Sequence, residues 1–207
     1  MMTAWYVFAI GAVAQLLFSG RTLLQWIISE KNKKVLTPSL FWKLSLIASF
    51  LLFIYGYLRN DFAIMLGQVL TYFIYVRNMQ LQGEWRKMHQ FIRIFILIFP
   101  LIIITIGYNN NKQDVDNLLN SEAIPDWLLI LGVVAQIIFT LRFVYQWIYS
   151  EKQKQSSLPF GFWMLSLLGS SLILLYAIFR KDPILIAGHV FGIVTYIRNI
   201  MLLRNQS

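Results

Sequence analysis

The sequence contains no cysteine and few charged residues, and both absences limit what the protein can be. Without cysteine, neither a disulfide framework nor a thiolate site is available. Only 13% of the 207 residues are charged, and nine of them are acidic, whereas 58% are hydrophobic. The mean hydropathy is +0.62. A soluble domain of this length does not carry such a surface, so the composition indicates a membrane protein.

Seven apolar segments, each bounded by polar or turn residues, predict seven transmembrane helices. About 20 apolar residues cross a bilayer as a helix, and lipid offers the backbone no hydrogen-bond partner. The segments cover residues 5–28, 39–58, 62–80, 91–108, 127–149, 160–179 and 183–203. The first lacks a basic flank and a small-residue cleavage site, so we interpret it as a span rather than a removable signal peptide. We therefore expect no separate catalytic domain within these residues.

An internal repeat relates the two halves of the chain. RTLLQWIISEK, residues 21–31, returns as RFVYQWIYSEK, residues 142–152. The offset of 121 residues holds without a gap from Gly11/Gly132 to Leu81/Leu202. It matches the rare polar residues as well as the apolar ones, which chance similarity between leucine-rich helices would not do. The chain is therefore predicted to contain a duplicated three-helix unit.

The repeat predicts three parts, which are a first repeat over residues 1–90, a linker helix with an outer loop over 91–125, and a second repeat over 126–207. Because three helices is an odd number, the linker helix restores a parallel arrangement, which gives a 3+1+3 plan. Most lysines and arginines fall on one side of the predicted spans, so we expect the N-terminus outside and the C-terminus in the cytoplasm. The net charge of +9 is mostly this anchoring and does not imply nucleic acid.

The pattern Gln-x-x-Phe-x-x-Arg-x-x-x-Gln-Trp-x-x-Ser-Glu, then Pro-x-x-Phe-Trp-x-x-Ser, then Tyr-x-Arg-Asn, occurs in both halves. It resembles the lipid A biosynthesis N-terminal domain family, which is named for a segment ahead of the glycosyltransferase in some lipid A disaccharide synthases. That family is similar in plan to the SWEET and PQ-loop transporters, although Pro38-Ser39 and Pro159-Phe160 replace the Pro-Gln dipeptide here. The resemblance implies a SWEET-like, multi-pass protein of the bacterial inner membrane.

Helical periodicity places the buried polar residues of each repeat on stripes that face inward, which predicts one cavity lined by both halves. The candidate substrate-binding residues are Arg21, Arg142, Gln15, Gln136, Gln25, Gln146, Asn78, Asn199, Tyr75, Tyr196, Trp42, Trp163, Gln68 and His189. Arg77 and Arg198 lie about 180° from their stripes. We expect these two arginines to anchor lipid phosphates or to pack against a neighbouring helix.

Burying an arginine costs several kcal/mol of free energy unless its guanidinium pairs with a counter-charge or a hydrogen-bond acceptor. For Arg21 and Arg142 two interpretations stay open, an ion pair across helices with Glu30 or Glu151, or the phosphate of a substrate. Trp42 and Trp163, like Trp26 and Trp147, suit either an interfacial belt or a platform for a sugar ring. His189 suits either a satisfied core position or a proton-coupling role.

These residues favour a translocator of a phosphate-bearing glycolipid intermediate in lipid A or envelope glycolipid synthesis, such as a polyprenyl-phosphate sugar or a lipid A precursor. One alternative is a SWEET-like carrier of small soluble sugars, which would have no use for buried arginines. Another is a non-catalytic membrane module that docks a glycosyltransferase. We expect no enzyme activity, metal or cofactor, because no carboxylate pair, metal cluster or nucleophile triad lies at membrane depth.

Overall fold

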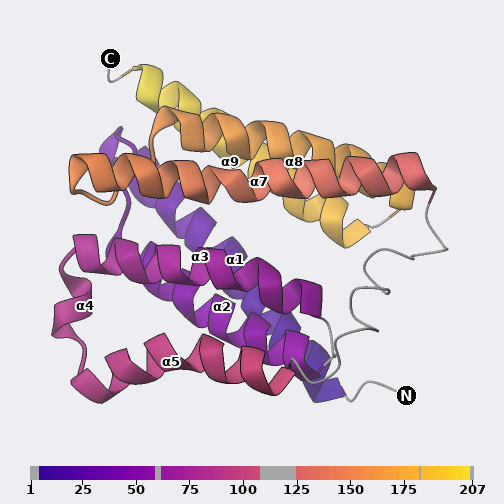
Figure 1. Cartoon of the computed structure of the whole chain (residues 1–207). Coiled ribbons are helices and arrows are strands. Elements are labelled where there is room, and N and C mark those ends of the chain that lie inside the picture. The colour runs from indigo at the N-terminus through magenta and orange to yellow at the C-terminus, as the bar shows by residue number, and fades with distance from the viewer. Residues whose placement is uncertain (1–4, 59–61, 108–124, 182, 206–207) are drawn as a thin grey trace. The chain divides into compact units, whose positions relative to one another are not determined.

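The computed structural model describes residues 5–58, 62–107, 125–181 and 183–205, and these residues form helices, turns and loops without a strand. Figure 1 labels the helices and colours them from indigo at the N-terminus to yellow at the C-terminus. They are α1 (Trp5–Asn32), α2 (Ser39–Leu58), α3 (Phe62–Leu81), α4 (Glu84–Lys87), α5 (Gln90–Gly107), α7 (Asp126–Gln153), α8 (Phe160–Arg180) and α9 (Pro183–Arg204).

The predicted segments coincide with helices to within a few residues wherever the structure describes them, and the all-α prediction is confirmed. Five stretches are long and apolar enough to cross a membrane, namely α1, α2, α7, α8 and Ile186–Arg204 of α9. Within α5, Gln90–Ile102 is a shorter apolar helix. The crossings by α3 and α5, and with them the SWEET-like count of seven, stay predictions.

The two long helices, α1 and α7, end in the same way. Lys33 and Lys154, which are equivalent under the offset of 121, both adopt the left-handed backbone conformation, with φ of 52° and 53°. The amide of Lys33 donates to Glu30 O at 3.2 Å, and the amide of Lys34 donates to Ser29 O at 3.1 Å. A left-handed residue after the last turn satisfies carbonyls that would otherwise lack a partner. The duplicated sequence therefore encodes a duplicated helix end.

The first of two compact units comprises Met1–Arg21 and Ser39–Ser121. In this unit α2 packs against α3, and α5 contacts both of them (Figure 1). Trp42, Phe53 and Tyr72 are fully buried and form much of the core. The ring of Tyr55 on α2 lies so close to Gly11 on α1 that a Cβ there would meet it at 2.9 Å. Glycine at position 11 therefore allows this close helix approach.

Pro100 lies inside α5 and cannot donate a backbone hydrogen bond to Ile96 O one turn earlier. The hydroxyl of Tyr72 on α3 donates to that same carbonyl at 2.9 Å. A freed carbonyl in an apolar environment needs such a substitute donor. Tyr72 thus links α3 to α5 at the point where α5 lacks its own donor.

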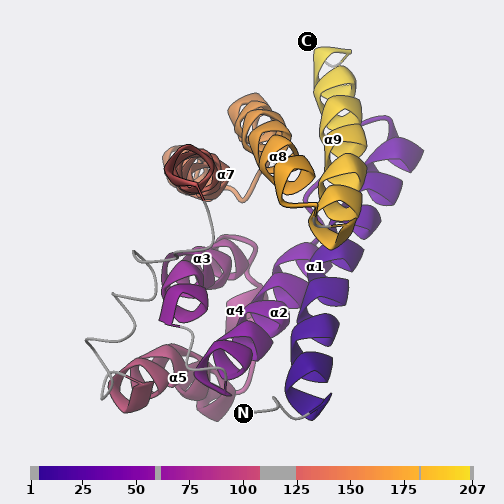
Figure 2. The same ribbon diagram turned by 90° about the vertical axis from the view of Figure 1, so that its right-hand side faces the viewer.

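The second unit comprises Thr22–Pro38 and Glu122–Ser207, so α1 contributes to both units. Within it, α8 lies between α7 and α9, as Figure 2 shows. The C-terminal part of α1 contacts α9, where the rings of Trp26 and Phe191 meet edge to face at 6.5 Å. Residues 22–38 belong to the second unit, whereas the first repeat was predicted to span residues 1–90. The division into two repeats and a linker helix stays a prediction.

Candidate functional site

Arg21 is buried in the first unit, with only 5% of its surface exposed. Its guanidinium carbon lies over three aromatic rings, at 4.5 Å from the centre of Phe18, 4.9 Å from Phe41 and 5.2 Å from Tyr75. Its Nη1 donates to the hydroxyl of Ser45, which in turn donates to Phe41 O at 2.5 Å. Three helices, α1, α2 and α3, therefore position groups around one cation.

Arg142 is buried in the second unit, with 8% of its surface exposed. Its guanidinium carbon lies 3.2 Å from the centre of the Phe139 ring, 4.7 Å from Phe143 and 5.9 Å from Phe162. Phe139 and Phe162 are the equivalents of Phe18 and Phe41 under the offset of 121. Both repeats therefore place a phenylalanine from each of their first two helices near the equivalent arginine.

Gly169 on α8 allows α7 to approach beside Arg142. A Cβ at position 169 would lie 2.8 Å from the backbone of Phe139, which is closer than real Cβ atoms come. Because backbone cannot move aside as a flexible side chain can, a larger residue would displace Phe139 and its ring. Glycine at this position therefore fixes the ring that lies nearest to the Arg142 guanidinium.

An aromatic ring stabilises a cation over its face by about 0.5–2 kcal/mol, with the larger values in desolvated sites. The planar guanidinium can be covered by rings and still offer N–H groups at its edge, and this fork matches a phosphate or a carboxylate. A site of this kind is chemically suited to an anion held inside an apolar environment. The residues of these two sites carry no metal-binding group, and the described chain contains no cluster of three His, Cys, Asp or Glu.

Glu30, which was one candidate partner for Arg21, pairs with Arg198. Arg198 Nε donates to Glu30 Oε2 at 2.8 Å, and Nη2 donates to Oε1 at 2.6 Å. Arg198 therefore packs against a neighbouring helix, α1, which is one of the two expected uses. Glu151 contacts Lys154 at 3.5 Å, and Arg77 donates to Gln80 at 3.0 Å.

The side chains of Gln25 and Gln146 hydrogen-bond to the loops that follow their helices. Gln25 Nε2 donates to Ser29 Oγ at 2.9 Å and to Leu36 O at 3.2 Å. Gln146 Nε2 donates to Ser150 Oγ at 2.8 Å and to Ser157 O at 2.9 Å. The spacing of these two sets is the same, with serine four residues and the loop carbonyl eleven residues beyond the glutamine. The two glutamines therefore have a structural role that their predicted place in a substrate site did not include.

Asn199 and Asn78 are fully buried. Asn199 Oδ1 accepts from Gln25 Nε2 at 2.9 Å, which brings two predicted site residues together in the second unit. The side-chain nitrogen of each asparagine donates to a carbonyl one turn earlier, Thr195 O and Ile74 O, at 2.9 Å. Their amide groups are thus oriented by their own helices.

Trp42 and Trp163 are both buried, with 0% and 1% of their surface exposed. Trp42 lies beside Tyr75 and Trp163 beside Tyr196, each pair with ring centres 6.0 Å apart. The interfacial-belt interpretation is wrong for this tryptophan pair, because neither ring reaches the surface of its unit. Tyr75, which touches both Trp42 and Arg21, connects two predicted site residues.

Gln68 and His189 occupy equivalent positions and make equivalent contacts. Ser49 Oγ donates to Gln68 Oε1 at 2.9 Å, and Ser170 Oγ lies 2.7 Å from His189 Nδ1. The His189 ring also meets Phe139 edge to face at 5.4 Å. His189 is therefore linked through Phe139 to the Arg142 site. In contrast, Gln15 and Gln136 are exposed on their own units.

Sequence reasoning did not assign a role to the phenylalanine rings around the arginines. Phe18 and Phe139 precede Arg21 and Arg142 by three residues, which places ring and cation on one face of a helix. Both are preserved by the offset of 121, as are Phe41 and Phe162. An aromatic residue one turn from a buried arginine, repeated in both halves, was the signal that could have identified them.

The model of one protein family, described as Lipid A Biosynthesis N-terminal domain, matches residues 10–80 and 131–201. The chain belongs to this family. Its two matched segments are themselves offset by 121 residues, so each repeat is one copy of the family domain. The paired arginines and their rings lie within these copies.

Several curated relatives are named lipid-A-disaccharide synthase. Those of Chlamydia felis and Chlamydia abortus are 28% and 29% identical over 97% of this chain and 34% of their own length. The relative of Chlamydia pneumoniae is 29% identical over 96% of this chain and 33% of its own length. The chain thus spans about a third of the length of these relatives. No solved structure matches it.

Proposed function

We propose that this protein binds a lipid that carries both phosphate and sugar, and moves it across the membrane during lipid A or envelope glycolipid synthesis. The observation that carries the proposal is the pair of equivalent arginines, each buried among aromatic rings in an apolar helical protein. Membership of a family named for lipid A biosynthesis supports the class of substrate. A polyprenyl-phosphate sugar and a lipid A precursor both have this chemistry.

The proposed division of roles follows from the chemistry of the side chains. The guanidinium groups of Arg21 and Arg142 would bind phosphate oxygens through two parallel N–H bonds, which a lysine cannot reproduce. Neutral groups would contact sugar hydroxyls, with the exposed amides of Gln15 and Gln136 the most accessible of the predicted set. A cavity lined by both halves is the expected path for the substrate, and it stays a prediction.

Translocation in reconstituted vesicles tests the proposal. Wild type and the Arg21→Lys, Arg142→Lys double variant would be compared for movement of a fluorescent polyprenyl-phosphate sugar between the two leaflets. The double variant is expected to lose most of the activity, because the lysine ammonium lacks the planar fork. Arg77→Lys is the matched control, since Arg77 lies on a different face and its Nη1 contacts Gln80.

Two results would count against the proposal. Equal translocation by wild type and the double variant would remove the phosphate-site claim. Uptake of a free sugar without movement of the lipid would support the SWEET-like carrier instead. Thermal unfolding of every variant is needed alongside, so that a loss of folding is not taken for a loss of binding.

A second candidate function is a membrane module that docks a glycosyltransferase. It is favoured by one observation, that this chain spans about a third of relatives named lipid-A-disaccharide synthase. The remaining two thirds of the Chlamydia felis relative, produced separately, should then bind this protein in vesicles. The docking role would be favoured if this segment still binds the Arg21→Lys, Arg142→Lys variant and if neither wild type nor the variant translocates the lipid.

A further inference from the structure

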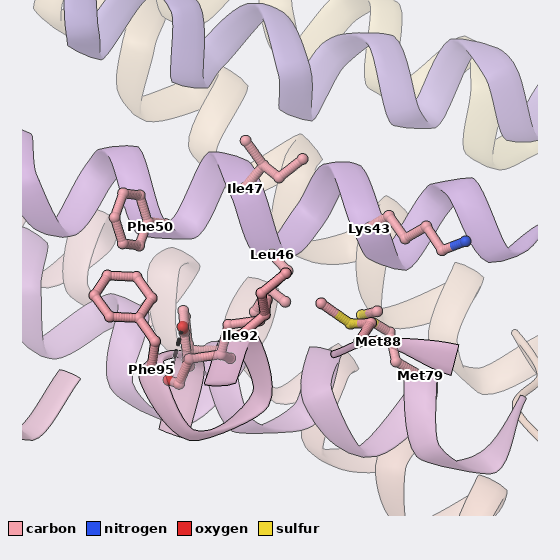
Figure 3. Close-up of a pocket in the computed structure, with 10 residues that line it drawn as sticks. Lys43, Leu46, Ile47, Phe50, Met79, Met88, Ile92 and Phe95 are labelled. Atoms are coloured by element: carbon pink, nitrogen blue, oxygen red, sulfur yellow. Dashed lines mark hydrogen bonds between the residues drawn. The ribbon is translucent and has the colours of Figure 1, made fainter. Parts of the chain in front are cut away.

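An apolar pocket of about 470 Å³ lies within the first unit, between α2, α3 and α5. Figure 3 shows Phe50 and Phe95 near one end of it and Lys43, Met79 and Met88 towards the other. It is separate from the arginine sites, because neither Arg21 nor any ring that covers it lines the pocket. Its volume is within the range of about 300–1,000 Å³ that is usual for small-molecule sites.

The pocket is elongated because two helices contribute one stripe each. Lys43, Leu46, Ile47 and Phe50 follow the helical spacing on α2, and residues 92, 95 and 96 form a facing stripe on α5. Phe50 follows Lys43 by seven positions, which corresponds to about 10 Å along α2. The one hydroxyl in the lining, that of Tyr72, is already bound to a backbone carbonyl. The lining therefore suits a hydrocarbon chain.

Positive charge is concentrated at one end of the pocket. Lys43 pairs with Glu84, which also accepts from Lys87 at 2.6 Å, so two ammonium groups share one carboxylate. The Lys43 side chain remains 40% exposed in spite of this pairing. The excess positive charge complements an anionic head group, and lysine is a common phosphate ligand as a point charge.

The second repeat does not preserve this arrangement. Under the offset of 121, Met164 takes the place of Lys43 and Ser171 takes the place of Phe50, and α5 has no equivalent. The charge at one end and the ring at the other are thus features of the first unit alone.

We propose that this pocket binds one acyl chain of an anionic phospholipid from the surrounding membrane, with the lipid phosphate at Lys43. The pocket opens among apolar helices, where lipid chains are the most abundant ligand, and its two methionines can adapt to a flexible chain. Lys43 lies in the second turn of α2, at the end predicted to face the cytoplasm. The bound lipid is therefore one of the cytoplasmic leaflet and occupies a site distinct from that of the proposed transported substrate.

Photo-cross-linking in vesicles tests this proposal on the full chain. Phosphatidylcholine vesicles would carry a small amount of phosphatidylglycerol with a diazirine in its acyl chain, and the cross-linked peptides would be mapped. Labelling is expected to concentrate on Ile47 and Met88. Ile47→Trp fills the pocket from a position that is 51% exposed and should reduce this labelling by about tenfold.

The repeat supplies the matched control for this change. Leu168 is equivalent to Ile47 and is 52% exposed, so Leu168→Trp makes the same enlargement in the other repeat and should leave pocket labelling unchanged. Ile92→Trp fills the same pocket from α5, which keeps the test valid if Ile47→Trp does not fold. Diazirine-bearing phosphatidylcholine should label the pocket less than phosphatidylglycerol does. Lys43→Gln should remove that preference, whereas Lys154→Gln, at an exposed lysine of the second unit, should retain it.

Labelling spread evenly over the exposed face of α5, and insensitive to both tryptophan variants, would show only lipid around the helix and would overturn the proposal. Equal labelling by the two lipids would overturn it as well, since Lys43 would then select nothing. These readouts do not depend on Arg21 or Arg142. A failure here is therefore distinguishable from a failure of the proposed transport function.

Discussion

Neutral groups stabilise the buried guanidinium groups of Arg21 and Arg142, in addition to any anion that these arginines bind. A charged side chain at membrane depth costs several kcal/mol. The three rings near each guanidinium offset part of that cost, at about 0.5–2 kcal/mol for each cation–π contact. The sites can therefore exist without a bound anion, as the proposed transport of a lipid phosphate requires.

At the same scale, the bond between Tyr72 and Ile96 O gives a prediction about stability. Tyr72→Phe should lower the free energy of unfolding by about 1 kcal/mol, because the carbonyl freed by Pro100 loses its donor. Denaturant unfolding in mixed micelles measures the change. In a Pro100→Ala background the helix supplies its own N–H to Ile96 O, so the same Tyr72→Phe change should cost less. An equal cost in both backgrounds would contradict this role for Tyr72.

At the scale of elements, the loops after α1 and α7 depend on one serine each. Ser29 Oγ accepts from the amide of Leu36 at 3.0 Å, and Ser150 Oγ accepts from the amide of Ser157 at 3.2 Å. Ser29→Ala should speed hydrogen exchange at the Leu36 amide and leave that of Ser157 unchanged. Ser150→Ala should have the opposite pattern. Ser19→Ala, at an exposed position of α1, is the control that should affect neither amide.

The contact between α4 and α2 gives a prediction about pH. The ammonium of Lys43, and then that of Lys87, lowers the pKa of Glu84 from its ordinary 4.5 to about 2. A carboxyl whose pKa is lower in the folded state stabilises the fold above its ordinary pKa, and this contribution is lost as the pH falls through about 2. The difference in Tm between wild type and Glu84→Gln should therefore be full near neutral pH and shrink below 4.5. A difference that is the same at all pH values would argue against the pairing.

Helices could be predicted from the sequence because apolar length and breaker residues are local properties. The predicted helix boundaries agree with those of the structure to within a few residues. Arg21 and Arg142 are buried, in agreement with their place on an inward-facing stripe. The partner of Glu30 could not be predicted in the same way. Angular arithmetic on α1 places Glu30 on a face, but only the packing of α1 against α9 decides that Arg198 meets it.

The sequence predicted the types of residue in the candidate site better than the contacts that these residues make. Gln25 and Gln146 lie on the same stripe as the arginines. Their amides nevertheless hydrogen-bond to the following loops, because the chain folds back and brings a carbonyl eleven residues later within hydrogen-bond distance. From the sequence, Trp42 suits an interfacial belt or a platform for a sugar ring equally, and only the neighbouring helices show that it is buried. A sequence pattern identifies which side chains are buried or polar, and tertiary packing determines which atoms they meet.

At the scale of the whole molecule, we propose that both arginines bind lipid phosphate. Each copy of the family domain carries a buried arginine at the equivalent position, so both copies offer the same cationic group. The orientation with the C-terminus in the cytoplasm stays a prediction from the loop charges. It would place Arg21 and Arg142 in the cytoplasmic half of the membrane, about 24 Å from the outer ends of their helices.

Equilibrium binding of two lipids that differ only in the phosphate tests this claim most directly. The protein would carry Ile47→Trp, so that the apolar pocket does not contribute. It should bind a polyprenyl-phosphate sugar at least about tenfold more tightly than the same lipid without phosphate. Adding Arg21→Lys and Arg142→Lys should abolish that preference, whereas adding Arg77→Lys should preserve it. An undiminished preference for the phosphate in the folded Arg21→Lys, Arg142→Lys protein would contradict the account.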